Sequence, residues 1–149
     1  MVLKQKLHQY CQFTLNKRLE AIQNSIRDLQ NALESETKSS AGDKHETGRA
    51  MLQLEREKTG QQLAEIQKLQ EVIQKINPES KHTKGALGSV IYTSKSNYFI
   101  AISIGEIQID NTNYYAISPG TPIAKLLLSK QVGDAIEFRD SKFTITEIQ

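Results

Sequence analysis

A seven-residue hydrophobic repeat near the N-terminus constrains the fold of this chain more than any other feature. Apolar residues recur with alternating four- and three-residue spacing at Leu15, Leu19, Ile22, Ile26, Leu29 and Leu33. This spacing puts one apolar stripe on a helix and is typical of a coiled-coil seam. Because no proline interrupts residues 1–77, the sequence predicts long helices throughout this stretch.

A second seam follows after an interruption. Its members are Thr59, Leu63, Ile66, Leu69 or Gln70, Ile73 and Ile76, and Thr59, Gly60 and Gln61 are its weak section. Between the seams, residues 35–48 gather Ser, Thr, Gly and charged residues and predict a turn. Two helices of similar length therefore form an antiparallel coiled-coil hairpin. About 30 helical residues make an arm on the order of 45 Å, a length that suggests reaching into a partner.

The composition changes after Pro78, whose preceding residue resists helical geometry. Seven of the nine aromatic residues lie in 84–149. Six β-forming segments are separated by turn signals such as Asp110-Asn111 and Arg139-Asp140. These segments are Ser89–Thr93, Tyr98–Ile104, Glu106–Ile109, Tyr114–Ile117, Ala135–Arg139 and Lys142–Ile148. One helix is expected at Thr121–Leu128, where a capping residue precedes a proline.

These patterns predict an α+β protein in two domains. Residues 1–77 form the N-terminal antiparallel coiled-coil helical hairpin, and residues 84–149 form a small antiparallel β domain with one helix. The 19 basic and 17 acidic residues are too evenly balanced to imply direct duplex binding. Cys11 alone cannot form an internal disulfide, and no signal segment or run of about 18 apolar residues occurs. We expect a cytoplasmic monomer without a membrane partner.

The stretch Ile117–Phe138 resembles the C-terminal signature of the Gre transcript-cleavage factors. That family runs IS, a spacer, SP, a small apolar helix, GKKVGD and an alternating strand, and this chain reads ISPGTPIAKLLLSKQVGDAIEF. The N-terminal half is similar to the coiled-coil hairpin of the same family, so the resemblance covers nearly the whole chain. It implies a transcription elongation factor of the GreA/GreB kind with an FKBP-like β domain. Such a factor acts on bacterial RNA polymerase and is not itself an enzyme.

The family carries an Asp-x-x-Glu pair after a glycine at the hairpin tip, and here Asp43 and Glu46 follow Gly42. The resemblance implies that the tip enters the secondary channel of the polymerase. There the two carboxylates hold the second Mg²⁺ of the polymerase active site, and the nascent RNA 3′ end is cleaved by the polymerase. Carboxylate oxygens are ligands that Mg²⁺ prefers, and two metals can stabilise the attacking and leaving oxygens of a phosphodiester.

The same tip has a plainer interpretation. Asp-x-x-Glu at the start of a helix is also a capping box, in which the two side chains satisfy free backbone amides. Lys38, Lys44 and Arg49 flank the pair and could contact RNA phosphate or polymerase carboxylates, although solvated charges near a turn are common. The family usually has uncharged residues between the two acids, so this tip is less acidic than the family's.

The resemblance also assigns a polymerase-binding loop to the β domain. Its residues are Ser118, Pro119, Gly120, Thr121 and Pro122. The family tends to have an acidic residue where Gly120 stands here.

Other functions stay open at this stage. Within the family, the chain could occupy the secondary channel as an inhibitor or regulator without cleavage activity. Outside it, the chain could be a coiled-coil adaptor, a chaperone or a small isomerase. His8 and Cys11 extend the first seam by one turn, so packing explains them and no zinc site is assigned. No nucleophile, base and orienting group occur together, so no catalytic residue is assigned.

Overall fold

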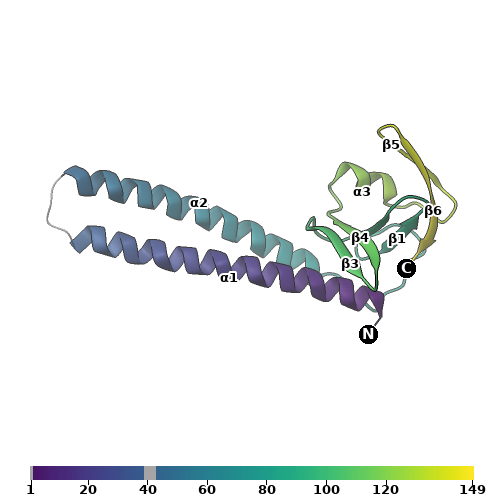
Figure 1. Ribbon diagram of the computed structural model, residues 1–149, viewed down its shortest axis with the longest axis horizontal. Helices are drawn as coiled ribbons and strands as arrows, with labels where there is room; N and C mark the ends of the chain where they lie inside the picture. Colours follow the sequence, from purple (N-terminus) through teal and green to yellow (C-terminus); the bar gives the residue numbers. More distant parts are fainter. Residues whose placement is uncertain (1, 39–42) are drawn as a thin grey trace. The chain divides into compact units, whose positions relative to one another are not determined.

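The structure is a computed structural model that describes residues 2–38 and 43–149, without the side chains of 37, 38 and 43–46. The described chain begins with two long helices, α1 (Leu3–Lys38) and α2 (Asp43–Gln74). They precede a small sheet with one short helix, and Figure 1 shows this order along the chain. The remaining elements are β1 (Val90–Thr93), β2 (Asn97–Ile100), β3 (Gly105–Ile109), β4 (Thr112–Ile117), α3 (Pro122–Leu127), β5 (Ala135–Phe138) and β6 (Ser141–Ile148). The predicted fold class is confirmed.

Contacts divide the chain into two compact units. We call Leu15–Gln70 the arm, and we call Met1–Thr14 together with Glu71–Gln149 the sheet unit. The first turns of α1 and the last turn of α2 therefore group with the sheet. The predicted domain limits, 1–77 for the hairpin and 84–149 for the β domain, stay a prediction.

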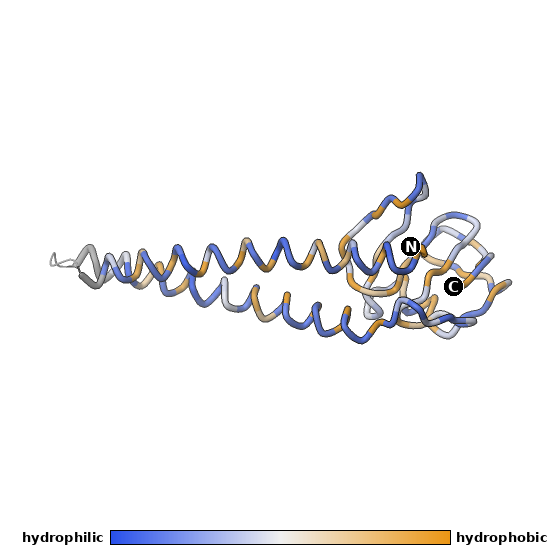
Figure 2. The backbone as a smooth tube through the Cα atoms, turned by 90° about the horizontal axis from the view of Figure 1, so that it is seen from below, coloured by the Kyte–Doolittle hydropathy of each residue, from blue (hydrophilic) through white to orange (hydrophobic). Residues whose placement is uncertain are grey.

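The arm is a two-helix hairpin in which α1 and α2 run side by side (Figure 1). Leu15, Thr59 and Ile66 are buried in its seam, and the remaining predicted seam residues of the arm are half-buried. In Figure 2, short hydrophobic stretches recur along both helices between longer hydrophilic ones. The helices also occupy much of the predicted turn, since α1 continues to Lys38 and α2 begins at Asp43. Glu36, Lys38, Lys44 and Glu46 are of good helix-forming types, which explains the extension.

Within the described residues, the strands form one sheet in the order β3-β4-β2-β1-β6-β5. Four of the five strand pairs recorded there are antiparallel, and β2 and β4 are parallel. Two-residue turns join β3 to β4 and β5 to β6, at the two predicted turn signals. Asp110, Asn111 and Arg139 adopt positive φ there, as tight hairpin turns require.

Both faces of the middle strands are buried. On one face, Ile91, Ile100 and Ile145 pack with Leu127 of α3. On the other face, Val90, Phe99, Ile107, Tyr114 and Ala116 are at most 4% exposed. Because the ends of α1 and α2 belong to the same compact unit, we infer that they cover this second face. Their contribution is a set of buried side chains, Leu7, Cys11, Ile73 and Ile76.

One strand ends earlier than predicted, because β2 pairs with β4 in parallel. We expected a strand over Tyr98–Ile104, but β2 ends at Ile100. The chain must leave the sheet there to reach β3, which lies on the far side of β4. Ala101 and Ile102 are nevertheless fully buried, and the Ala101 amide donates to the Ile117 carbonyl at 2.8 Å. The β-like composition of this segment therefore reflects burial and not strand pairing.

Candidate functional site

The loop between β4 and α3 contains the five residues that the family resemblance assigns to polymerase binding. It forms a tight turn, because the Thr121 amide donates to the Ser118 carbonyl at 3.1 Å. The Thr121 hydroxyl donates to the same carbonyl at 2.8 Å. These two bonds close the segment from Ser118 to Thr121 into one rigid structure, so the structure brings all five predicted residues together.

Thr121 also begins α3, as the sequence predicts. Its side chain oxygen accepts a hydrogen bond from the Ala124 amide at 3.3 Å, and its extended backbone is that of an N-cap residue. Pro122 follows at the first helical position, where a proline's missing amide costs nothing. Ala124 and Leu127 are buried and hold α3 on the sheet. The loop is therefore fixed at both ends, by β4 and by α3.

A second serine supports the turn. The Ser103 hydroxyl donates to the Ser118 hydroxyl at 3.0 Å, and it also accepts from the Ser118 amide at 3.0 Å. Ser103 follows β2, and the parallel pairing of β2 with β4 brings its segment beside Ser118. Sequence reasoning missed Ser103, because no local spacing relates residues that are fifteen positions apart.

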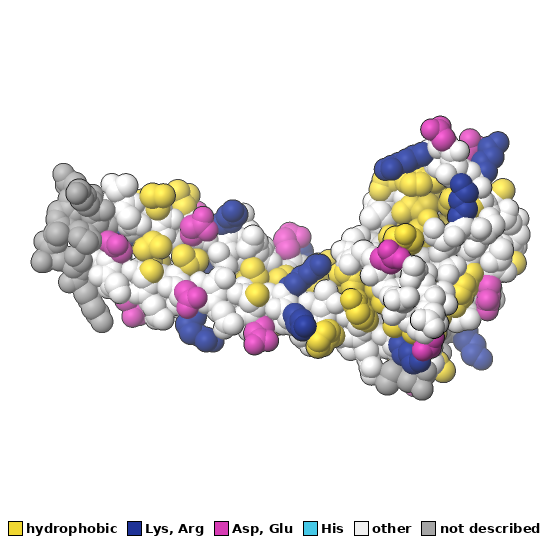
Figure 3. Space-filling model, viewed as in Figure 1, with side chains coloured by type: hydrophobic (Ala, Val, Ile, Leu, Met, Phe, Trp, Pro, Cys, Tyr) yellow, Lys and Arg dark blue, Asp and Glu magenta, His cyan; other side chains and the backbone are white. Residues whose placement is uncertain are grey.

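The loop presents a small mixed surface. Gly120 and Pro122 are exposed, whereas Ser118, Pro119 and Thr121 are half-buried. One turn further along α3, Leu126 is 36% exposed, and i and i+4 residues share a helix face. Lys125 is exposed beside it. In Figure 3, hydrophobic side chains gather on the part of the visible surface formed by α3 and β5. Pro122 and Leu126 therefore give this end of α3 an exposed apolar patch, with Lys125 at its edge.

The structure places the predicted tip residues only by backbone. Asp43 begins α2 and Glu46 lies in its first turn, but the side chains of both, like those of Lys38 and Lys44, lie outside the described part of the chain. Arg49 is described and exposed on α2. Among the described residues, no group of three His, Cys, Asp or Glu residues could hold a metal ion.

His8 and Cys11 pack in the interior, as predicted. Cys11 is fully buried, and burial raises the pKa of its thiol to about 12. His8 is 9% exposed, and its Nε2 lies 2.9 Å from the Ile73 carbonyl oxygen, so it joins the start of α1 to the end of α2. A thiol with so high a pKa is a poor nucleophile.

The aromatic residues of the sheet unit serve packing in most cases. Tyr92 and Tyr114 meet edge to face with centroids 6.0 Å apart, and burial raises the pKa of Tyr92. Phe99 and Phe143 are buried. Among the seven aromatic residues of 84–149, Tyr115 is the most exposed, at 40%. Within the described residues, no helix is both long and apolar enough to span a membrane.

Fold and loop together define a helical hairpin protein with a small, mainly antiparallel sheet. No family model matches the chain, and no curated protein matches it. One similar solved structure is GreA factor homolog 1 (Gfh1) of Thermus thermophilus, at 17% identity over 91% of this chain and 92% of that chain, with a TM-score of 0.36. Another is described as the transcription factor Gfh1, at 17% identity over 95% and 92%, with a TM-score of 0.34. Likeness at this level says nothing of function.

Proposed function

We propose that this chain is a transcription factor of the Gre kind that binds bacterial RNA polymerase. The observation that carries the proposal is the segment Ile117–Phe138. Its residues resemble the Gre signature, and they form one continuous structure of turn, capped helix, second turn and strand. A long two-helix arm precedes this segment in the same chain, in the order that the resemblance implies.

The loop from Ser118 to Pro122 is the docking contact in this proposal. A rigid loop loses little conformational entropy when it binds, and two hydrogen bonds to the Ser118 carbonyl hold this one. Pro122 and Leu126 supply exposed apolar surface.

The hairpin tip acts in the secondary channel of the polymerase. Asp43 and Glu46 are three residues apart at the start of α2, a spacing that places them on one side of a helix. Their carboxylates would help to hold the second Mg²⁺ of the polymerase active site, and the polymerase would then cleave backtracked RNA near its 3′ end. The metal is shared with the polymerase and is not bound stably by the isolated chain. No residue of this chain reacts covalently.

A second candidate follows from the charge of the tip. Lys44 and His45 stand between the two acids, and Arg49 follows closely. Positive charge beside carboxylates weakens their attraction for a divalent cation. The same chain would then occupy the channel and slow the polymerase without promoting cleavage.

Transcript cleavage by stalled complexes distinguishes the candidates. Asp43→Asn and Glu46→Gln remove the charge that binds Mg²⁺, but both amides still cap a helix. We expect each variant to lose at least about tenfold in stimulated cleavage while binding polymerase normally. Glu57→Gln, the same kind of change at an exposed site on the arm, is the control and should keep full activity. Full cleavage by the double tip variant contradicts metal holding, and a wild-type protein that binds but only slows elongation supports the inhibitor.

Binding to core polymerase tests the docking loop. Pro122→Asp should weaken binding at least about tenfold, because it places a charge in an apolar contact. The fold should survive, since an acidic residue is favourable in the first turn of a helix. Gln108→Glu adds the same charge at an exposed position of β3 and should leave binding unchanged. Equal affinity of the two variants would show that this loop does not dock.

A further inference from the structure

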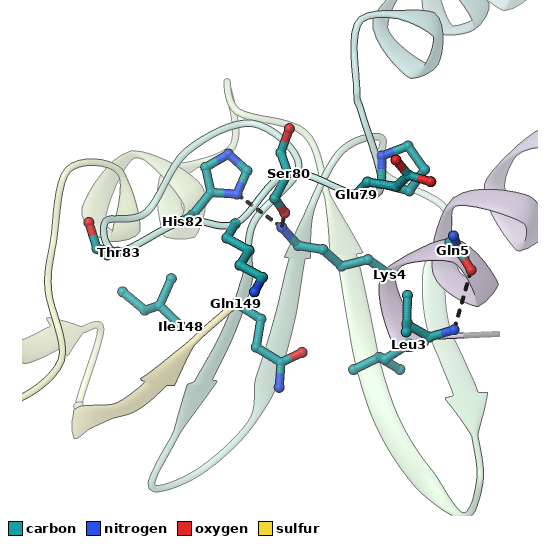
Figure 4. Close-up of a pocket in the computed structure, with 12 residues that line it drawn as sticks. Leu3, Lys4, Gln5, Glu79, Ser80, His82, Thr83, Ile148 and Gln149 are labelled. Atoms are coloured by element: carbon teal, nitrogen blue, oxygen red, sulfur yellow. Dashed lines mark hydrogen bonds between the residues drawn. The ribbon is translucent and has the colours of Figure 1, made fainter.

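A hollow of about 620 Å³ lies in the sheet unit, and no residue of the loop Ser118–Pro122 lines it. It is bounded by the first residues of α1, by the linker Pro78–Thr83 and by the last residues of β6. Figure 4 shows Lys4 extending from α1 toward Ser80 and His82 of the linker, with Leu3, Ile148 and Gln149 around it. The volume falls in the range of small-molecule sites, which is about 300–1,000 Å³.

The polar centre of the hollow is the ammonium group of Lys4. This residue is only 6% exposed. Its Nζ donates to the Ser80 carbonyl at 2.7 Å and to Nδ1 of His82 at 3.0 Å. Both acceptors are neutral, and the described residues place no carboxylate within ion-pair distance of Lys4.

A buried charge without a counter-ion is costly. An ammonium group has three donors, and two are used here, so one remains for a further acceptor. Burial lowers the pKa of Lys4, which is the expected sign for a cation that lacks an anionic partner. Lys81 and Glu79 also line the hollow, with opposite charges. The remaining donor of the buried Lys4 ammonium therefore favours a negatively charged acceptor in the hollow.

The walls are apolar. Val2, Leu3, Pro78 and Ile148 line the hollow, and such surfaces favour a ligand with a hydrocarbon body over a small inorganic ion. The first turn of α1 also lines it and contains no acidic residue, so the helix end adds weak attraction for a negative group. One acidic group and an apolar chain therefore fit the site together.

We propose that the hollow beside Lys4 and His82 binds a small organic acid, with the carboxylate at the Lys4 ammonium and the apolar body against Leu3, Pro78 and Ile148. The ligand would join α1 to the linker through Lys4. This inference does not depend on the proposed action on RNA polymerase.

Octanoate is the probe ligand. Two control ligands are compared with it: 1-octanol, which lacks the negative charge, and acetate, which lacks the apolar chain. We titrate the full chain with octanoate and follow the backbone amide chemical shifts. Octanoate should change the amide shifts of residues 2–5, 79–83 and 148–149. We expect 1-octanol and acetate to bind at least about tenfold more weakly, because each lacks one of the two recognised groups. Equal binding of octanoate and 1-octanol, or shifts confined to other residues, would overturn the proposal.

Two lysine variants distinguish octanoate binding in the hollow from non-specific attraction of octanoate to a positive charge. Lys4→Met removes the ammonium group and should reduce octanoate affinity at least about tenfold. Lys6→Met is the control, because Lys6 is on the same helix but pairs with Asp110 at 3.0 Å and does not line the hollow. Equal losses in both variants would refute the proposal. Should Lys4→Met fail to fold, the comparison of the three probes on the wild-type chain decides the question alone.

Discussion

The arm and the sheet unit are stabilised in different ways. The sheet unit has a core in which Phe99, Ile100 and Leu127 have no exposed surface. In the arm, most seam residues are half-buried, and a polar residue, Thr59, is among the best buried. Two helices alone cannot enclose a side chain from all directions, whereas a sheet covered on both faces can. Stability should therefore be concentrated in the sheet unit, and the arm should be the more easily opened region.

The middle of the arm is its weakest section. Thr59 donates its hydroxyl hydrogen bond to the Glu55 carbonyl at 2.8 Å, an arrangement that tends to bend helices. Gly60 follows, and an open cleft at this level is lined by residues of both helices, including Asp28 of α1 and Lys58 of α2. The weak section predicted from the sequence thus coincides with an open cleft on the surface of the arm.

The largest expected effect comes from truncating matched isoleucines in the two regions. Ile100→Ala should cost about 4 kcal/mol of unfolding free energy, because it leaves a cavity in a closed core. Ile26→Ala, at a half-buried seam position, should cost only about 1 kcal/mol. Denaturant unfolding measures both values. Equal costs would contradict the difference that we draw between the regions.

Two glycines offer the next test. At Gly85 an added Cβ would lie 2.0 Å from the Leu127 carbonyl oxygen, so Gly85→Ala should lose about 3 kcal/mol or more by overpacking. At Gly120 nothing lies within 4 Å of that position, and Gly120→Ala should be close to neutral. Thermal unfolding of the two variants side by side measures the difference. A tolerated alanine at position 85 would mean that the backbone at Gly85 does not pack closely against the end of α3.

Substitution of Gly60, in the middle of the arm, should change stability in the opposite direction. Gly60→Ala should stabilise the arm by up to about 1 kcal/mol, because alanine is the better helix former. The nearest atom to the new Cβ is the end of the Arg56 side chain at 3.4 Å, which can move. Hydrogen exchange of amides in Leu15–Gln70 should slow, while exchange in the sheet stays unchanged. Faster exchange in the arm would show that Gly60 is needed for its geometry.

The smallest expected effect is a pH dependence confined to the sheet unit. Burial, and then the nearby Lys4 charge, lower the pKa of His82 from its ordinary 6.5. Below pH 6.5 the unfolded chain takes up this proton before the folded chain does, so stability falls as the pH falls toward the folded pKa. The variant His82→Gln should therefore lose less unfolding free energy between pH 7.5 and pH 5.5 than the wild-type chain. Unfolding measured at several pH values in this range gives both losses. An unchanged pH profile would remove His82 as its cause.

Much of the fold could be predicted from local pattern, and the exceptions share a physical cause. The heptads predicted the two helices, the Thr121-Pro122 pair predicted the start of α3, and the turn signals predicted both two-residue hairpins. The parallel pairing of β2 with β4 could not be predicted, because it depends on where β3 inserts in the sheet. The close approach of Gly85 to Leu127 also joins distant segments.

The candidate site likewise has features that could be predicted from the sequence and features that could not. Its loop residues came from the family resemblance, and the cap at Thr121 could be predicted from residue type alone. The hydrogen bonds between Ser103 and Ser118 could not be predicted from the sequence. The bonds from Lys4 to Ser80 and His82 could not be predicted either, since all of these contacts join residues that are distant in the sequence. The tip pair stays a prediction, because its side chains lie outside the described part of the chain.

The grouping of both ends of the hairpin with the sheet has a consequence for how the length of the arm can change. Because the chain leaves the sheet unit after Thr14 and returns to it at Glu71, the arm is one continuous stretch of chain between two segments of that unit. Removing seven residues from each helix would keep the seam in register and shorten the reach by about 10 Å. The length of the arm can therefore change by whole heptads without any change in the residues of the sheet unit.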